Sequence, residues 1–309
     1  MVKDVIYLND CRESMINGFR EGYKPGATTH FLTINGHFSF LRKEVTLFGG
    51  NANHGKSTLY LQMKVLRAKH DNESFAIFSP ENSPPDFFYN DIIHMVSGKY
   101  PARGPMTEDE YFEWMRWVQE HFFYVYPETE TPTPEYINDR FEKVFDEHGV
   151  SAVCIDPFNQ LSHDWNREGR SDLYITSFLN KCKRFAQRFD LNYDIIGHPN
   201  GTVKILDDGN KDCPNVWNIA GGAAWDAGLD NAVFTHRPNK TTNPKDPEVL
   251  FRVSKIKKYN IVGVPDDIKL HFDKVKNRYS DIHGSPFDDD YGKVQSKMFN
   301  EPDLGGDPF

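Results

Sequence analysis

The sequence has few cysteines and lacks long apolar runs. Only four of its 309 residues are cysteines, and no two of them form a C-x-x-C pair. This scatter argues against a structural zinc site or a disulfide framework and is typical of a reducing cytoplasm. No stretch approaches the roughly 18 consecutive apolar residues of a transmembrane helix. The first ten residues lack the order of a secretory signal, so we expect no membrane association.

Positive charge is also in short supply. Lys and Arg together number 36 against 45 Asp and Glu, which gives a net charge of −9. A net negative charge does not exclude nucleic acid as a ligand, because binding depends on the local electrostatic potential at the contact surface. Residues 281–309 are rich in Gly, Pro and Asp, a composition that predicts an acidic disordered tail.

From residue 31 onward, strand-like and helix-like segments alternate. Before that, residues 10–21 read as a short amphipathic helix and residues 22–29 as a linker. The sequence does not decide whether this helix packs on its own domain or on a neighbouring subunit. We therefore expect a linker helix and linker in residues 1–30, one domain in 31–280 and the tail in 281–309.

The pattern of that domain predicts its fold class. Strands are expected at residues 45–48, 75–79, 122–126, 152–155, 193–197, 231–236, 249–257 and 268–279, and helices at 58–70, 107–121, 133–149 and 172–189. Alternating strands and helices followed by a late run of strands indicate an α/β fold. We expect a mostly parallel sheet with helices on both faces and a β-rich C-terminal part.

A glycine-rich loop supplies the first chemical motif. Residues 50–57 read G-N-A-N-H-G-K-S and match the phosphate-binding pattern G-x-x-x-x-G-K-[ST]. The glycines let backbone N–H groups surround phosphates, Lys56 would reach the β- and γ-phosphates, and the Ser57 hydroxyl would hold Mg²⁺. The motif lies between an expected strand and an expected helix, as it should. We expect a site for ATP and Mg²⁺ lined by Gly50, Asn53, His54, Gly55, Lys56, Ser57 and Thr58.

Polar residues follow three other expected strands. Asp156 ends the strand 152–155 and is the candidate second Mg²⁺ ligand, the Walker B carboxylate. Pro157 stands where many motor ATPases carry a catalytic Glu, so the base must come from elsewhere. Glu81 follows the strand 75–79, and His198 follows the strand 193–197. The carboxyl ends of parallel strands meet at one edge, which favours Glu81 as the base and lets His198 detect the γ-phosphate.

Together these motifs resemble the RecA-like ATPase domain of ring-shaped replicative helicases, the DnaB-like family. The resemblance is strongest to phage and mitochondrial members that pair with primases, and it spans about residues 31–279. The motifs that carry it are Glu81, Asp156, I-G-His198-P-N, Gly221-G-A-A-Trp225, Asp230-Asn231, Arg237 and Lys255-I-Lys257. The resemblance implies a RecA-like P-loop NTPase fold and an ATP-dependent DNA helicase. It further implies a homo-oligomeric ring, expected to be a hexamer, that translocates on single-stranded DNA.

The resemblance also implies roles for individual residues. Glu81 would be the general base and His198 the γ-phosphate sensor. Arg237 and Phe272 match positions that sandwich the adenine, and a guanidinium and an aromatic ring suit a base face.

The loop after His198 would bind DNA. It runs from about Asn200 to Asn218 and offers Asn200, Lys204 and Lys211 as contact residues. Its net charge over residues 200–217 is −1, from two Lys against three Asp. Backbone amides and Asn200 would therefore have to supplement the lysines.

A basic residue from the neighbouring subunit is expected to complete the site. The family pattern is Lys-x-Arg, whereas this sequence reads Lys255-x-Lys257. Lysine is a point charge and cannot fork over a phosphate as arginine does. We take Lys257 as the finger that reaches the neighbour's γ-phosphate, and keep Lys258 and Arg278 as alternatives.

The tail suggests protein partners. It combines the acidic run 288–290 with the terminal Phe309, and such tails in similar replication proteins steer toward a basic surface and insert the aromatic ring. A DNA polymerase or a primase is the expected partner. No primase-type motif precedes the ATPase region, so the chain resembles the helicase part alone. The resemblance implies the cytoplasm of a bacterial or phage-infected host cell.

Two other functions fit parts of this pattern. A RecA-fold DNA-binding ATPase, recombinase-like or regulatory, would share the motifs without unwinding DNA. A P-loop small-molecule kinase would need an arginine-rich lid over the substrate that accepts the phosphoryl group, and the sequence shows no such arginine cluster. Ring size, polarity of travel and the choice between DNA and RNA are not encoded in these motifs.

Overall fold

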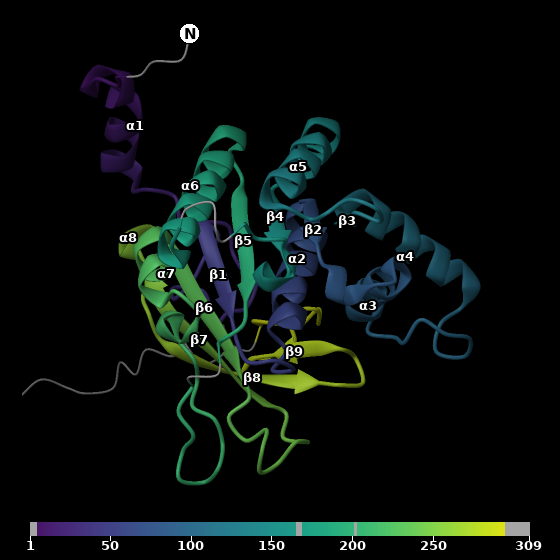
Figure 1. The fold of residues 1–309 in the computed structure, drawn as a ribbon. Helices are drawn as coiled ribbons and strands as arrows, with labels where there is room; N and C mark the ends of the chain where they lie inside the picture. Colours follow the sequence, from purple (N-terminus) through teal and green to yellow (C-terminus); the bar gives the residue numbers. More distant parts are fainter. Residues whose placement is uncertain (1–4, 165–168, 201–202, 294–309) are drawn as a thin grey trace, which may run out of the picture.

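A central mixed sheet organises the chain in our computed structural model, which describes residues 5–164, 169–200 and 203–293 (Figure 1). In this part of the chain the strand order is β3-β2-β4-β5-β1-β6-β7-β8-β9. The strands are β1 Val45–Gly49, β2 Phe75–Phe78, β3 Phe122–Val125, β4 Ala152–Ile155, β5 Asn192–Gly197, β6 Asn231–His236, β7 Glu248–Ile256, β8 Asp267–Asp273 and β9 Arg278–Ser280. The first six strands in this order, from β3 across to β6, run parallel to one another. Strands β7, β8 and β9 each run antiparallel to the strand before them. The expected fold class is confirmed.

Helices cover both faces of this sheet (Figure 1). The helices in the described part of the chain are α1 Leu8–Glu21, α2 Lys56–Asp71, α3 Pro85–Ser97, α4 Glu108–His121, α5 Pro134–His148, α6 Ser171–Phe189, α7 Gly222–Gly228 and α8 Tyr259–Val262. Successive strand residues point to opposite faces; in β1, Leu47 joins the core beneath α5, α6 and α7, whereas Phe48 joins the core beneath α2 and α3. No helix in the described part of the chain is long and apolar enough to span a membrane.

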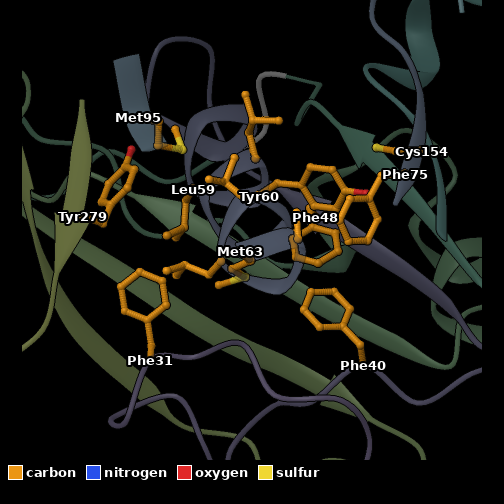
Figure 2. Packing of buried hydrophobic residues seen from close by; sticks show 14 of the residues in the cluster. Phe31, Phe40, Phe48, Leu59, Tyr60, Met63, Phe75, Met95, Cys154 and Tyr279 are labelled. Carbon is orange, nitrogen blue, oxygen red and sulfur yellow. The ribbon is translucent and has the colours of Figure 1, made fainter. Parts of the chain in front are cut away.

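The α2 face is rich in aromatic side chains, as Figure 2 shows. Leu59, Tyr60 and Met63 of α2 pack between Phe48 of β1 and the segment that carries Phe31. Each fully buried side chain of this size contributes about 1.5–3 kcal/mol. The helix that follows the glycine-rich loop is therefore held firmly against the sheet.

The structure differs from the sequence prediction in two places at the C-terminal end of the domain. The expected strand 268–279 is two strands, β8 and β9, because the chain turns at Asn277, whose φ is +53°. Composition places residues 281–293 in the disordered tail, but in the structure they pack on the domain. Asp281 accepts hydrogen bonds from the Thr33 amide (3.1 Å) and the Tyr291 hydroxyl (2.6 Å), and Phe287 is buried. The rest of the tail, residues 294–309, lies outside the described residues.

Helix α1 stands apart from the sheet in Figure 1. All its residues are described, and none of them is buried. Its apolar stripe includes Met15, Ile16 and Phe19, and the ring of Phe19 is 92% exposed. The helix thus leaves its stripe uncovered within its own subunit.

A buried ion pair fastens α2 to the sheet. Lys64 of α2 and Asp194 of β5 are both fully buried, and Lys64 Nζ lies 2.7 Å from Asp194 Oδ2. The Tyr60 hydroxyl donates to the same carboxylate at 3.0 Å, and Lys64 Nζ lies 3.7 Å from the centre of the Phe40 ring. Burial lowers the pKa of Lys64 to about 8, while Asp194 opposes the shift. Each charge therefore needs the other.

Removing one partner tests this dependence. Asp194→Asn keeps the shape of the side chain but leaves the Lys64 charge uncompensated, so we expect a loss of about 3–5 kcal/mol in the free energy of unfolding. Glu142→Gln breaks the exposed Arg188–Glu142 pair (2.7 Å) and should cost less than about 1 kcal/mol. Urea unfolding of both variants measures the difference. Equal losses would contradict the assignment.

Candidate nucleotide-binding site

The glycine-rich loop lies where the topology places a ligand site. It joins β1, which ends at Gly49, to α2, which begins at Lys56. β1 lies between β5 and β6 in the sheet, and β4 lies next to β5. The carboxyl ends of these parallel strands therefore surround the loop. Thr58, half-buried, occupies the first turn of α2.

Tyr279 of β9 closes against the base of the loop. Its hydroxyl donates to the Gly55 carbonyl at 3.1 Å, and a Cβ on Gly55, whose φ is +85°, would lie 2.1 Å from that hydroxyl. The Gly55 carbonyl and the Lys56 amide belong to one planar peptide, so the hydroxyl also fixes the direction of the Lys56 N–H. Gln62 bonds the Tyr279 backbone on both sides, at 2.6 and 2.8 Å. No short sequence pattern indicates this contact.

Two hydroxyls hold the expected Walker B carboxylate. Ser57 Oγ donates to Asp156 Oδ1 at 3.0 Å and Ser79 Oγ donates to Oδ2 at 3.3 Å. Asp156 is 6% exposed. Burial raises its pKa to about 6, and Lys56 opposes that shift most. Burial likewise lowers the pKa of Lys56, with Asp156 and then Glu81 opposing. The three charged groups thus interact across the loop.

Glu81 and His198 complete the cluster. Glu81 lies in the short turn Pro80–Asn82 after β2; its carboxylate is exposed and accepts a 3.4 Å hydrogen bond from Gln160 Nε2. His198 directly follows β5 and is partly buried. Burial and then Lys56 lower the pKa of His198, while Glu81 opposes them; the net shift favours the neutral imidazole. The structure therefore brings together the expected Lys56, Ser57, Asp156, Glu81 and His198.

The residues present fit a nucleotide with Mg²⁺. Ser57 and Asp156 offer the oxygen ligands that Mg²⁺ prefers when it also binds substrate phosphates. Residues 5–164, 169–200 and 203–293 contain no group of three or more His, Cys, Asp or Glu that could hold a metal by protein ligands alone. In the loop itself, Asn51 Nδ2 is a buried donor with no hydrogen-bond partner in the described structure. A phosphate oxygen of a bound nucleotide would accept a hydrogen bond from this buried Asn51 donor.

The two residues expected at the adenine converge on one segment. Arg237 donates to the carbonyls of Pro244 (2.6 Å) and Asp246 (3.1 Å), and the Phe272 amide donates to Pro247 at 2.9 Å. The Phe272 ring lies 4.8 Å from the ring of Tyr279. Tyr279 therefore contacts both the phosphate loop and Phe272, one of the two residues expected at the adenine.

The outer end of the loop contacts the chain after β6. The Arg237 amide donates to His54 Nδ1 at 2.9 Å, and Lys240 Nζ donates to the Asn53 carbonyl. The His54 ring is stacked on His236 with ring centres 5.1 Å apart. Burial lowers the pKa of His54 to about 3 and that of His236 to about 4. Both rings are therefore neutral, and His54 Nδ1 is free to accept.

The expected DNA loop is closed at its base. The Asn200 amide donates to the Asn218 carbonyl at 2.9 Å. Further out, Ile205 pairs with Lys211, and the Asp212 amide donates to the Lys204 carbonyl at 2.8 Å. Both lysine side chains are exposed on this paired segment. Residues 201–202 lie outside the described structure.

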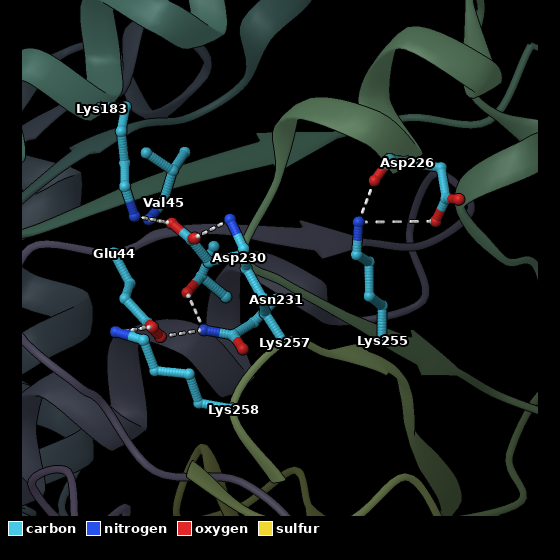
Figure 3. A network of polar contacts seen from close by, with 10 residues as sticks. Glu44, Val45, Lys183, Asp226, Asp230, Asn231, Lys255, Lys257 and Lys258 are labelled. Carbon is cyan, nitrogen blue, oxygen red and sulfur yellow. Dashed lines mark hydrogen bonds and ion pairs between the residues drawn. The ribbon is translucent and has the colours of Figure 1, made fainter. Parts of the chain in front are cut away.

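The candidate finger lysines lie near the amino-terminal ends of β1 and β6, whereas the phosphate loop follows the carboxyl end of β1. Figure 3 shows the polar contacts of these lysines. β7 runs antiparallel to β6, so Ile256 pairs with Asn231 at the end of β6 far from the loop. Lys257 Nζ lies 3.4 Å from Asp230 and Lys258 Nζ 3.0 Å from Glu44, while Lys255 contacts Asp226. All three lysines are therefore separated from the nucleotide-binding site of their own chain by the whole length of β6.

Arg278, the other alternative finger, is excluded. It is 8% exposed and donates to the carbonyls of Met95 (2.6 Å) and Val96 (2.9 Å). Its guanidinium also lies 4.1 Å from the centre of the Phe287 ring. The residue anchors β9 to α3, so it does not reach a neighbouring subunit.

Comparison with known proteins agrees with this architecture. No protein-family model matches the sequence. The chain is 25% identical over 276 residues to the chloroplastic/mitochondrial Twinkle homolog protein of Arabidopsis thaliana, a match that spans 86% of this chain and 38% of the plant protein. A solved structure of an isolated ATPase domain superposes with a TM-score of 0.72 at 14% identity, covering 90% of this chain and 100% of that one. A DnaB-like replicative helicase, described with its interactions with primase, gives 0.69 at 13% identity and covers 91% and 68%.

In its fold and in its glycine-rich loop the chain is similar to P-loop ATPase domains. More particularly, the fold is the RecA-like fold of helicase ATPase domains, and the chain is similar to the ATPase domains of DnaB-like helicases. The resemblance expected from the motifs is confirmed.

Removing the Tyr279 hydroxyl tests its hold on the loop. One neutral hydrogen bond contributes about 0.5–1.5 kcal/mol, so Tyr279→Phe should raise the Kd for ATP about two- to tenfold. Titration with a fluorescent ATP analogue measures this. Tyr193→Phe is the matched control: its buried hydroxyl donates to Asn138 (2.8 Å), remote from the loop. Unchanged affinity in Tyr279→Phe would refute the role.

Proposed function

We propose that the chain is the ATPase part of an ATP-dependent replicative DNA helicase that works as a homo-oligomeric ring, expected to be a hexamer. One observation carries the proposal. Lys56, Ser57, Asp156, Glu81 and His198 meet at one edge of the sheet, and an exposed lysine cluster lies at the opposite edge. A complete site with a basic finger therefore needs two copies of the chain.

Within this proposal each residue has a chemical task. ATP supplies the free energy of phosphoryl transfer, and Ser57 with Asp156 would hold its Mg²⁺. Lys56 and the loop amides stabilise the phosphate charge. Glu81, exposed and so accessible to water, accepts the proton of the attacking water. Neutral His198, between Lys56 and the loop after β5, donates or accepts one hydrogen bond according to what lies at the γ-phosphate position.

The contacts of the lysines favour Lys257 as the finger. Its side chain is 62% exposed, and its partner Asp230 is also held by Lys183 and by the Val45 amide (3.0 Å). Asp230 therefore stays compensated when Lys257 moves away (Figure 3).

Lys258 is less suited to that task. It is the ion-pair partner of Glu44, which is 1% exposed and whose Oε1 has no hydrogen bond in the described structure. Moving Lys258 toward a neighbouring subunit would leave a buried carboxylate without its countercharge, which is costly. Lys257 carries no such penalty.

We propose single-stranded DNA as the translocation substrate, contacted by Asn200, Lys204 and Lys211 from each subunit. Similarity to a helicase that was described with its interactions with primase supports primase as a partner. A DNA polymerase would bind the tail beyond residue 293. The chain spans about 38% of the plant relative's length. The four cysteines are all free, which suits the cytoplasm of a bacterial or phage-infected cell.

Two substitutions test the catalytic assignment. Lys56→Ala should abolish DNA-stimulated ATP hydrolysis, because it removes the phosphate-binding charge. Glu81→Gln should still bind ATP but lose about 10²–10⁴-fold in turnover. Binding and turnover are measured separately, and the exposed Glu113→Gln on α4 serves as control. Full turnover in Glu81→Gln would overturn the base assignment.

A forked-duplex assay separates helicase activity from the alternative. The alternative is a recombinase-like or regulatory RecA-fold ATPase, which would bind DNA and hydrolyse ATP without strand separation. We expect ATP-dependent unwinding that Lys56→Ala abolishes. DNA-stimulated hydrolysis without unwinding at any protein concentration would favour the alternative.

A further inference from the structure

The segment 237–246, which follows β6 and is here called the bridging loop, contacts two functional loops at once. On one side it reaches the phosphate loop. The Arg237 amide donates to His54 Nδ1 at 2.9 Å, and Lys240 Nζ donates to the Asn53 carbonyl. Asn53 has a φ of +60°, a left-handed backbone conformation that asparagine adopts more readily than most residues.

On the other side the bridging loop holds the expected DNA loop through one side chain. Asn210 is 2% exposed. Its Oδ1 accepts from the amides of Thr241 (3.1 Å) and Thr242 (3.2 Å), and its Nδ2 donates to Thr242 Oγ1 at 2.9 Å. Asn210 also closes the turn of its own loop, because its carbonyl accepts from the Leu206 amide at 2.8 Å.

A second contact runs beside the first. The His236 ring is stacked on His54, with ring centres 5.1 Å apart, and it lies near the backbone of Lys211, the residue after Asn210. Asn210 thus fixes the residue that precedes Lys211, an exposed candidate DNA contact, to the bridging loop. Leaving a buried amide such as that of Asn210 unpaired is unfavourable, so the bridging loop and the DNA loop move together.

We propose that Asn210 is the positioning residue through which the state of the phosphate loop is communicated to the DNA loop, a coupling that rests on the proposed function. The path is Asn53 and His54, then the bridging loop, then Asn210 and Lys211. This path reaches the DNA loop at the paired segment between Lys204 and Asp212, far from the base of the loop. His198, in contrast, adjoins the base of the loop. Coupling is reciprocal, so DNA bound at Lys211 also biases the phosphate loop.

The test compares coupling with basal activity. The ATPase rate of the full chain is measured with and without oligo-dT. The affinity for labelled oligo-dT is measured with ADP and with a non-hydrolysable ATP analogue. Asn210→Ala should leave the basal rate unchanged, lower the DNA stimulation about fivefold or more, and remove the difference between the two DNA affinities. Asn138→Ala, which removes only the partner of the Tyr193 hydroxyl, should retain both effects.

The outcomes of this experiment distinguish failure of the proposed function from failure of the coupling through Asn210. If wild type shows no DNA stimulation, the proposed function fails. If wild type is stimulated and folded Asn210→Ala is stimulated equally, with the nucleotide effect on DNA affinity intact, only this inference fails. Should circular dichroism show Asn210→Ala to be unfolded, Thr242→Val decides instead. It removes the hydroxyl that Asn210 binds and should weaken stimulation in the same direction, and unchanged stimulation would overturn the proposal.

Discussion

The attraction between Lys56 and Asp156 holds the site in its charged form. Both side chains are only 6% exposed, and burial by itself drives the pKa of the lysine down and that of the carboxylate up. Each is the leading influence that opposes the shift of the other. The sheet makes this possible, because β1 and β4 are separated only by β5. Ser57 and Ser79 then orient the carboxylate.

The same sheet separates the two halves of the proposed mechanism. The phosphate loop, Glu81 and His198 lie at the carboxyl ends of the parallel strands, and the lysines after β7 lie at the other edge. Helix α1 leaves its apolar stripe exposed within its own subunit. An isolated subunit thus presents the phosphate loop at the carboxyl ends of the parallel strands, lysines at their opposite ends, and a helix with an uncovered apolar stripe. The proposed ring would bring these three surfaces of neighbouring subunits together.

Much of the candidate nucleotide-binding site could be predicted from sequence because its residues lie in local motifs. The phosphate loop is a continuous stretch, and Asp156, Glu81 and His198 each follow an apolar strand, so the rule that parallel strands end at one edge predicts their meeting. Tyr279 and Asn210 could not be found this way. Their contacts depend on pairing of β9 with β8 and on packing between loops about 30 residues apart, which no short pattern encodes. Arg278 likewise resembles a free basic residue until the position of α3 and Phe287 is known.

Mixing two inactive variants tests the shared site most directly. Lys56→Ala and Lys257→Ala are assayed apart and co-expressed. If the site is built from two subunits, mixed rings contain junctions with an intact Lys56 facing an intact Lys257, and DNA-stimulated ATP hydrolysis rises above the sum of the separate variants. Lys56→Ala mixed with Lys258→Ala controls for nonspecific effects and should not exceed its sum. Hydrolysis by the first mixture that only equals its sum would contradict the account.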